Sequence, residues 1–217
     1  MPVKILIFSL LSILLTCTAA HAIEFRAVAE AKNSGRLVLA PGWQVKEKEG
    51  KASFAPIDDG GVKALCMKSE NTSFSIQREI KVDVKQYPYV TWRWRVDRLP
   101  KGGDFRHDST DDQAAQLFVA FAGRDSISYI WDTTAPVGTT GSQWIPMVMK
   151  VKITVVGSGG KDLGKWVSVT RNVYEDYKKL FGHEPPAAEG LRFQINSQHT
   201  GTSAGSCLEY VEFRNTP

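Results

Sequence analysis

The sequence of 217 residues lacks the short motifs that mark the common enzyme classes. It has no Ser-His-Asp order typical of serine hydrolases, no metal-binding cluster of His and Cys, and no glycine-rich phosphate loop. The net charge is only +4, and the basic residues form no cluster, which argues against a nucleic-acid partner. Internal repeats and low-complexity tracts are also missing, so we expect a single domain with an ordinary surface.

Long apolar runs are confined to the start of the chain. Lys4 precedes the apolar run 5–16, and Ala20-His21-Ala22 fits the small-x-small site of a signal peptidase. The run is shorter than the roughly 20 residues that span a bilayer. We therefore expect residues 1–22 to be a signal peptide cleaved after Ala22, and residues 23–217 to form one exported, periplasmic domain. The rest of the sequence has no apolar stretch long enough to cross a membrane.

Cysteine is scarce. Loss of the leader removes Cys17 and leaves Cys66 and Cys207 as an isolated pair. In an oxidising compartment such a pair is a disulfide candidate, so we predict a bridge between them. Cys66 falls in an early strand and Cys207 in the last one, so the bridge would place these strands side by side. Two buried free thiols are the alternative.

The run 90–96 alternates between large apolar and polar side chains. Because strand side chains point to opposite faces with period two, Trp92 and Trp94 share one face while Arg93 and Arg95 share the other. Two tryptophans on one face need a deep apolar layer to cover them. The motif therefore predicts a strand inside a two-layered β protein.

Further strand-like runs, rich in Val, Ile, Phe, Tyr and Trp, lie between turn residues. They are 43–48, 52–55, 63–69, 73–82, 115–122, 126–131, 147–156, 166–171, 191–197 and 207–213. This pattern predicts an all-β protein, a single-domain antiparallel β-sandwich that resembles a jelly roll. We expect segments 147–156 and 166–171 to pair as a hairpin, because the turn signal 157–160 separates them.

One short helix is expected near residues 173–181. Asn172 and Glu175 form a capping box at its start, while Gly182 and the following Pro185-Pro186 end it. Its aromatic and leucine stripe predicts packing against an edge of the sandwich rather than a ligand site.

The loop after the double-tryptophan strand carries four aspartates, Asp104, Asp108, Asp111 and Asp112. Clustered carboxylates suit a hard cation, so a structural calcium ion is one interpretation. The spacing matches no EF-hand, however, and Arg106 lies within the cluster. We favour the second interpretation, in which Asp111 or Asp112 pairs with Arg93 or Arg95 and holds the loop in place.

Two other segments carry groups suited to a polar ligand. Trp131 and Trp144 flank the Thr- and Gly-rich loop 132–143 and are candidates for stacking on sugar rings. The polar run 196–203 supplies amides and an imidazole from Asn196, Gln198 and His199. The predicted ligand-binding residues are Arg95, Asp111, Asp112, Trp131, Trp144, Asn196, Gln198 and His199.

These motifs together resemble a bacterial exported family known as DUF3047. The resemblance rests on Trp-Arg-Trp-Arg-Val at 92–96, Asp111-Asp112, the segment 172–181 and Asn-Ser-Gln-His-Thr-Gly at 196–201. It implies a periplasmic β-sandwich and brings no established activity. The closing strand 207–213 is also similar to the last strand of galactose-binding-like jelly rolls.

Three functional hypotheses follow. The favoured one is a non-catalytic binding module for a carbohydrate or another polar ligand of the cell envelope, with no catalytic residue. A structural envelope protein without a small-molecule ligand is the second. The third is a glycan-acting enzyme that uses Asp111 or Asp112 with Arg95 or His199.

Overall fold

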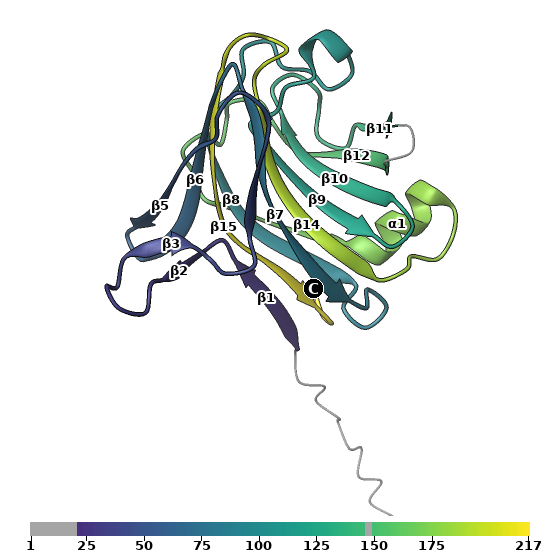
Figure 1. Cartoon of the computed structure of the whole chain (residues 1–217). Helices are drawn as coiled ribbons and strands as arrows, with labels where there is room; N and C mark the ends of the chain where they lie inside the picture. Colours follow the sequence, from purple (N-terminus) through teal and green to yellow (C-terminus); the bar gives the residue numbers. More distant parts are fainter. Residues whose placement is uncertain (1–20, 146–148) are drawn as a thin grey trace, which may run out of the picture.

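The computed structural model describes residues 21–145 and 149–217 (Figure 1). The predicted signal segment falls outside the described residues as far as position 20, and the first strand, β1 (Ala22–Arg26), begins at the residue that precedes the predicted cleavage point. Within the described part of the chain, no helix is long and apolar enough to cross a membrane.

The strands form two sheets that face each other (Figure 1). The six-stranded sheet has the order β13 (Val167–Asn172), β8 (Tyr89–Arg98), β15 (Ser203–Arg214), β6 (Val62–Glu70) and β5 (Ser53–Asp59), with β1 beside β15. The seven-stranded sheet has the order β11 (Thr140–Ile145), β12 (Met149–Ser158), β10 (Asp125–Asp132), β9 (Ala115–Phe121), β14 (Ala188–Asn196), β7 (Ser73–Val82) and β4 (Gln44–Glu49). A small separate ribbon joins β2 (Val28–Glu30) to β3 (Leu37–Leu39).

The predicted β-sandwich is confirmed, with one refinement of its strand pairing. Every sheet pair is antiparallel except β10 and β12, which run parallel. The predicted hairpin between 147–156 and 166–171 is wrong, because β12 pairs with β10 and β11 whereas β13 pairs with β8 in the other sheet. The residues after β12 lead the chain across to the six-stranded sheet, so β13 does not return beside β12 in the same sheet.

The tryptophans of β8 form the centre of the core between the two sheets. Trp92 and Trp94 are fully buried. The Trp92 ring stacks on Tyr129 of the opposite sheet, with ring centroids 5.2 Å apart, and Trp94 lies 6.5 Å from the Phe193 ring. Full burial of such side chains stabilises the fold by about 1.5–3 kcal/mol each. The alternation in 90–96 therefore placed these residues correctly.

The predicted disulfide is present. Cys66 and Cys207 lie opposite each other on the adjacent strands β6 and β15, and their sulfurs are bonded. The bridge closes a loop with a sequence separation of 141 residues, so it links an early strand to the last one as expected.

The predicted helix is also present, as α1 (Val173–Phe181). The Asn172 side chain accepts a hydrogen bond from the Glu175 backbone N–H, and Gly182 ends the helix in the left-handed region at φ 81°. Tyr177 is the buried anchor of the helix, and its ring packs against Phe121 at 4.6 Å.

The arginine face of β8 has partners other than those predicted. Arg93 pairs with Glu209 of β15 at 3.0 Å, and Arg95 pairs with Asp97 of its own strand at 2.8 Å and with Asp59 of β5. The Trp166 ring lies over both guanidinium groups. Pairing with Asp111 or Asp112 is wrong because both arginines face outward from the six-stranded sheet. The guanidinium groups of Arg93 and Arg95 are therefore already paired with carboxylates.

Candidate functional site

The outer face of the seven-stranded sheet carries polar side chains in rows across the strands. Leu117, Val119 and Phe121 of β9 point into the core, so the alternate residues, among them Phe118, point outward. In the ladder register Phe118 lies opposite Arg192 of β14, Arg192 opposite Gln77 of β7, and Gln77 opposite Gln44 of β4. With strands about 4.8 Å apart, this row spans about 14 Å.

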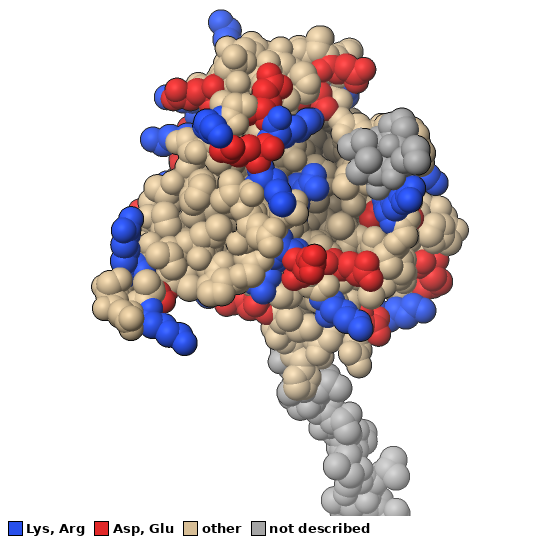
Figure 2. Space-filling model, in the orientation of Figure 1, with Lys and Arg blue, Asp and Glu red and all other residues tan. Residues whose placement is uncertain are grey.

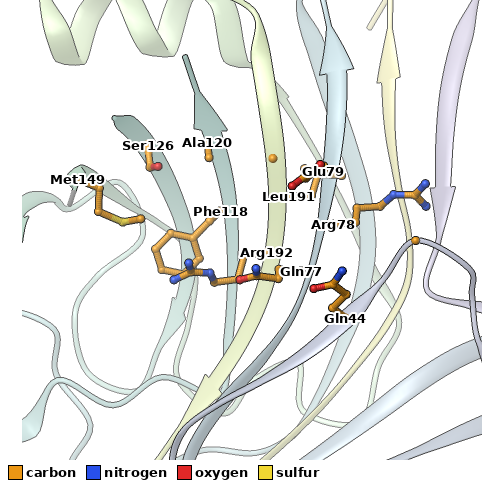
Figure 3. Close-up of a pocket in the computed structure, with 12 residues that line it drawn as sticks. Gln44, Gln77, Arg78, Glu79, Phe118, Ala120, Ser126, Met149, Leu191 and Arg192 are labelled. Atoms are coloured by element: carbon orange, nitrogen blue, oxygen red, sulfur yellow. The ribbon is translucent and has the colours of Figure 1, made fainter. Parts of the chain in front are cut away.

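The row lines a pocket of about 460 Å³. Figure 3 shows the side chains that surround it, including Gln44, Gln77, Phe118, Ser126, Met149 and Arg192. The Arg192 guanidinium lies over the Phe118 ring, 5.5 Å from its centroid. The size is typical of a small-molecule site, and the lining combines an apolar floor with amide and guanidinium groups.

A second pocket adjoins the first at the end of the sheet where β14 finishes. It shares Phe118, Met149 and Arg192 with the first pocket. Its other polar residues are Lys48, Asp111, Gln113, Gln116, Gln143, Gln194, Asn196 and His199. We refer to the two pockets together as the groove. The protein surface is visibly hollowed over these strands (Figure 2).

Amides and one carboxylate are linked by hydrogen bonds at this end of the groove. Asn196 donates to the Asp111 carbonyl at 2.7 Å and accepts from Gln116 at 2.6 Å. The Asp111 carboxylate accepts from the side-chain amides of Gln113 and Gln143. Burial raises the pKa of Asp111 above its usual range, while these two amide donors act in the opposite direction. These hydrogen bonds hold the side chains of Asp111, Asn196 and their glutamine partners in fixed positions.

Asp112 is buried next to the end of the groove and does not line it. Its side chain is fully buried and accepts hydrogen bonds from the Asn196 amide at 3.0 Å, from the backbone N–H of His199 at 3.3 Å, and from Thr200. Thr200 contributes its backbone N–H at 2.7 Å and its hydroxyl at 2.8 Å. The carboxylate thus fixes the loop 197–202, and with it the position of His199, at the end of the groove.

A small apolar cluster, separate from the main core, lies beside the groove on the same outer face. Phe105, from the acidic loop, packs with Ile153 of β12 and with Phe118. It approaches Gly141 of β11 so closely that a Cβ there would lie 2.6 Å from the ring. The Phe105 backbone N–H donates to Asp132 at 3.0 Å. The acidic loop therefore folds over part of the sheet and leaves the groove open beside it.

The structure brings three of the predicted ligand residues together. Asp111, Asn196 and His199 all line the second pocket, and the His199 Nδ1 atom lies 3.0 Å from the Asp111 carbonyl oxygen. Gln198 lies next to His199, with its Nε2 atom 3.4 Å from Nδ1, but it is not among the residues that line the groove.

Three other predicted residues do not belong to this surface. Trp131 is 3% exposed, and its indole N–H donates to the Gly159 carbonyl, so it is a core residue without a free stacking face. Trp144 is 59% exposed, but it directly follows Gln143 on β11 and pairs with Lys150. Because neighbouring side chains of a strand point to opposite faces and Gln143 points into the groove, Trp144 faces away from it. Arg95 lies on the other sheet. Loop proximity was a misleading signal for the exposure of Trp131, whereas Trp144 is exposed as its position beside the loop suggested.

The four aspartates of the acidic loop have separate partners. Asp104 accepts from Arg106 at 2.8 Å, Asp111 accepts from amides, and Asp112 holds the 197–202 loop. Asp108 is exposed in a single 3₁₀ turn. Among the described residues, no group of three or more His, Cys, Asp or Glu side chains is arranged to hold a metal ion.

The sequence interpretation missed the residues that form the middle of the groove, Gln77, Gln116, Phe118, Arg192 and Gln194. Their signal is present as period-two alternation: β9 reads Gln116, Phe118 and Ala120 on one face, and β14 reads Arg192, Gln194 and Asn196. Attention to loops, where binding residues are common, drew the prediction away from these strands.

The architecture is that of a jelly-roll β-sandwich. The xyloglucanase domain of NopAA, a type three effector from Sinorhizobium fredii in complex with cellobiose, is similar over 79% of this chain and 91% of its own, with a TM-score of 0.50 and 10% identity. The family 11 carbohydrate-binding module of the cellulosomal cellulase Lic26A-Cel5E of Clostridium thermocellum covers 90% and 95%, with a TM-score of 0.45 and 8% identity. Endoglucanase 3 of family GH12 from Trichoderma harzianum covers 90% and 96%, with a TM-score of 0.44 and 11% identity. At such low identity the likeness to the xyloglucanase domain bears on the fold alone.

The chain belongs to the family described as protein of unknown function DUF3047, whose model matches residues 41–212. The resemblance seen in the sequence motifs is thereby confirmed. No curated protein sequence matches the chain.

Proposed function

We propose that this protein is a non-catalytic carbohydrate-binding module whose ligand lies along the groove. The observation that carries the proposal is the set of amide side chains that five separate strands contribute to the groove, Gln44, Gln77, Gln116, Gln143 and Gln194. An amide offers both donors and acceptors, which matches the hydroxyl groups of a sugar. The groove crosses several strands, so it suits a chain of sugar units better than a compact metabolite.

The mode of binding differs from the aromatic stacking expected at Trp131 and Trp144. Phe118 is the aromatic residue common to both pockets, and it is only 9% exposed beneath Arg192. Hydrogen bonds to fixed amides therefore carry recognition in this proposal, with Phe118 and Met149 as the apolar floor. The xyloglucanase domain of similar fold was observed with cellobiose, which is in keeping with a jelly roll that binds sugar.

The positions of the carboxylates favour binding over glycoside hydrolysis. A pair of catalytic carboxyl groups lies about 5–9.5 Å apart in most glycosidases. In the groove, Glu79 lies opposite Gly190, while Asp111 contacts Asn196. These two places on β14 are six residues apart, or about 20 Å along the strand. Arg95 is on the other sheet and pairs with neither Asp111 nor Asp112. His199 lies beside both, with its Nδ1 atom 3.4 Å from the Asp112 carboxylate, but Asp112 is fully buried and its oxygens already accept several hydrogen bonds, which favours a structural role for this pair.

We further propose that the protein acts outside the cytoplasm. A disulfide persists in oxidising compartments, and the pattern of residues 1–22 is that of a cleaved leader. A bound glycan of the cell envelope would then be accessible to it.

The test is calorimetric titration of the purified protein with soluble polysaccharides of different backbones, together with an assay for new reducing ends. We expect saturable binding without cleavage. Gln194→Ala should weaken binding several-fold, because one hydrogen bond contributes about 0.5–1.5 kcal/mol. Gln86→Ala is the matched control, since Gln86 is exposed on the turn after β7 and does not line the groove. Absence of binding to every polysaccharide, or equal effects of both substitutions, would refute the proposal.

A further inference from the structure

The centre of the groove holds an arginine that has no acidic partner. The Arg192 guanidinium forms neither an ion pair nor a hydrogen bond with any described residue, and it lies over the Phe118 ring. Arginines on the other faces are treated differently: Arg93, Arg106 and Arg171 each pair with a carboxylate at 3.0 Å or less. Arg36, Arg98 and Arg124 also lack an ion pair but are exposed, whereas Arg192 is half-buried in the groove.

Arg192 is partly removed from water. Its surroundings lower the pKa of the guanidinium through burial alone, with no acidic group acting in the opposite direction. An arginine nevertheless stays protonated in proteins, so the site holds a full positive charge with incomplete solvation. Such a charge is costly to the free protein, and an anion placed against it would recover part of that cost.

The geometry leaves the charged edge of the guanidinium available to a ligand. The guanidinium lies over the Phe118 ring and no described side chain accepts a hydrogen bond from it, and Figure 3 shows Arg192 with Gln77 beside it on the groove floor. The planar fork of an arginine matches a carboxylate or phosphate in a bidentate manner. Gln77 and Gln194, the neighbours in register and along the strand, supply amides for adjacent hydroxyl groups.

The groove also holds two carboxylates and a lysine. Glu79 lies opposite Gly190, two residues from Arg192 on the same face, and forms no ion pair with Arg192. Asp111 is already engaged by Gln113 and Gln143, and Lys48 lines the second pocket. Arg78, at the rim of the first pocket, also lacks an ion pair among the described residues and lies over the Phe25 and Trp43 rings. Arg192 and Arg78 therefore carry positive charge in the groove without an ion pair to any described carboxylate.

Resting on the proposed carbohydrate function, we infer that the groove selects an acidic glycan, in which an oxyanion attached to a sugar ring forms paired hydrogen bonds with Arg192. A carboxylate of a uronic acid and a sulfate ester share this chemistry.

The probes are pairs of polysaccharides that differ in charge on the same backbone. Polygalacturonate is compared with its methyl ester for the carboxylate, and dextran sulfate with dextran for the sulfate. Calorimetric titration is carried out with the wild-type protein and with Arg192→Gln, Arg192→Lys and Arg36→Gln. Arg36 is the matched control, because it is exposed near β3 and lies outside the groove. Unchanged thermal unfolding of each variant verifies that it is folded.

We expect the acidic member of at least one pair to bind at least tenfold more tightly than its neutral partner. Arg192→Gln should weaken that binding about tenfold or more, since hydrogen bonds to charged groups are among the strongest. Arg192→Lys should retain part of the affinity, and Arg36→Gln should retain all of it. Whichever pair responds identifies the carboxylate or the sulfate as the source of the oxyanion.

Two results would overturn the inference, and they differ in whether the proposed carbohydrate binding is refuted as well. Equal affinity for charged and neutral members, or equal losses in Arg192→Gln and Arg36→Gln, refutes the anionic selection while leaving carbohydrate binding intact. Absence of binding to all four probes and to the wider set of polysaccharides refutes both the inference and the function on which it rests.

Discussion

Replacing Asp112 with asparagine tests whether this buried carboxylate holds the end of the groove together. Four donors converge on its two oxygens: the Asn196 amide, the backbone N–H groups of His199 and Thr200, and the Thr200 hydroxyl. Asparagine has nearly the same shape but presents one carbonyl oxygen and one NH₂ group. In either orientation of the new amide, its NH₂ group faces donors that previously found an acceptor.

The expected loss of stability follows from those unsatisfied donors. A buried donor without a partner costs about 1–3 kcal/mol, and at least one backbone N–H and one further donor lose their acceptor. We therefore expect Asp112→Asn to lower the free energy of unfolding by about 2–4 kcal/mol. For a chain of this length, this corresponds to a fall in Tm of about 4–16 °C.

The assay is urea unfolding at pH 7, accompanied by differential scanning calorimetry. Asp108→Asn is the matched control, because Asp108 lies in the same loop, is exposed, and should change stability by no more than about 0.5 kcal/mol. If Asp112→Asn unfolds at the same urea concentration as Asp108→Asn, the assignment of Asp112 as the anchor of loop 197–202 is wrong.

Two more predictions concern stability. The double variant Cys66→Ala/Cys207→Ala should lower the free energy of unfolding by about 2–5 kcal/mol, because the bridge closes a separation of 141 residues. Alkylation of both cysteines in unreduced wild-type protein, detected by mass spectrometry, would contradict the bridge. Hydrogen bonds from Arg106 hold the pKa of Asp104 well below its usual range, so the charged form adds stability above its unfolded pKa of about 3.9, and this contribution is lost as the pH falls through the folded pKa. The Tm difference between wild type and Asp104→Asn should therefore shrink between pH 6 and pH 2, and a constant difference would show that Asp104 acts through packing instead.

Local chemistry was enough to predict several elements. The capping box at Asn172 and the left-handed Gly182 define the two ends of α1 within one short segment, so no distant contact is needed to place them. The alternation of 90–96 likewise decides which side chains enter the core, because a strand can bury only one of its two faces here. The position of Trp131 was misjudged because its strand continues to the core edge, where Gly157 leaves room for the indole ring.

The ion-pair partners of Arg93 and Arg95 were harder to predict from the sequence. We predicted Asp111 or Asp112 as the acids that pair with Arg93 or Arg95. Arg93 instead pairs with Glu209, because β8 lies beside β15 in the six-stranded sheet. Arg95 pairs with Asp97, two residues away on its own strand, and with Asp59 of β5. An ion pair depends on which strands become neighbours, and sequence distance is a poor guide to that.

The sequence by itself determined the sandwich class, the helix with its caps, the tryptophan core and the pairing of two lone cysteines. Each follows from periodicity of two, from local hydrogen bonds or from the small number of possible partners. Only the tertiary structure decided the groove. Gln44, Gln77, Phe118 and Arg192 are scattered over the chain, and they form one row because the strand order β9-β14-β7-β4 and the ladder register bring them together. The unpaired charge of Arg192 arises from the same arrangement, since the register places Gln77 and Phe118 directly opposite it, and neither is acidic.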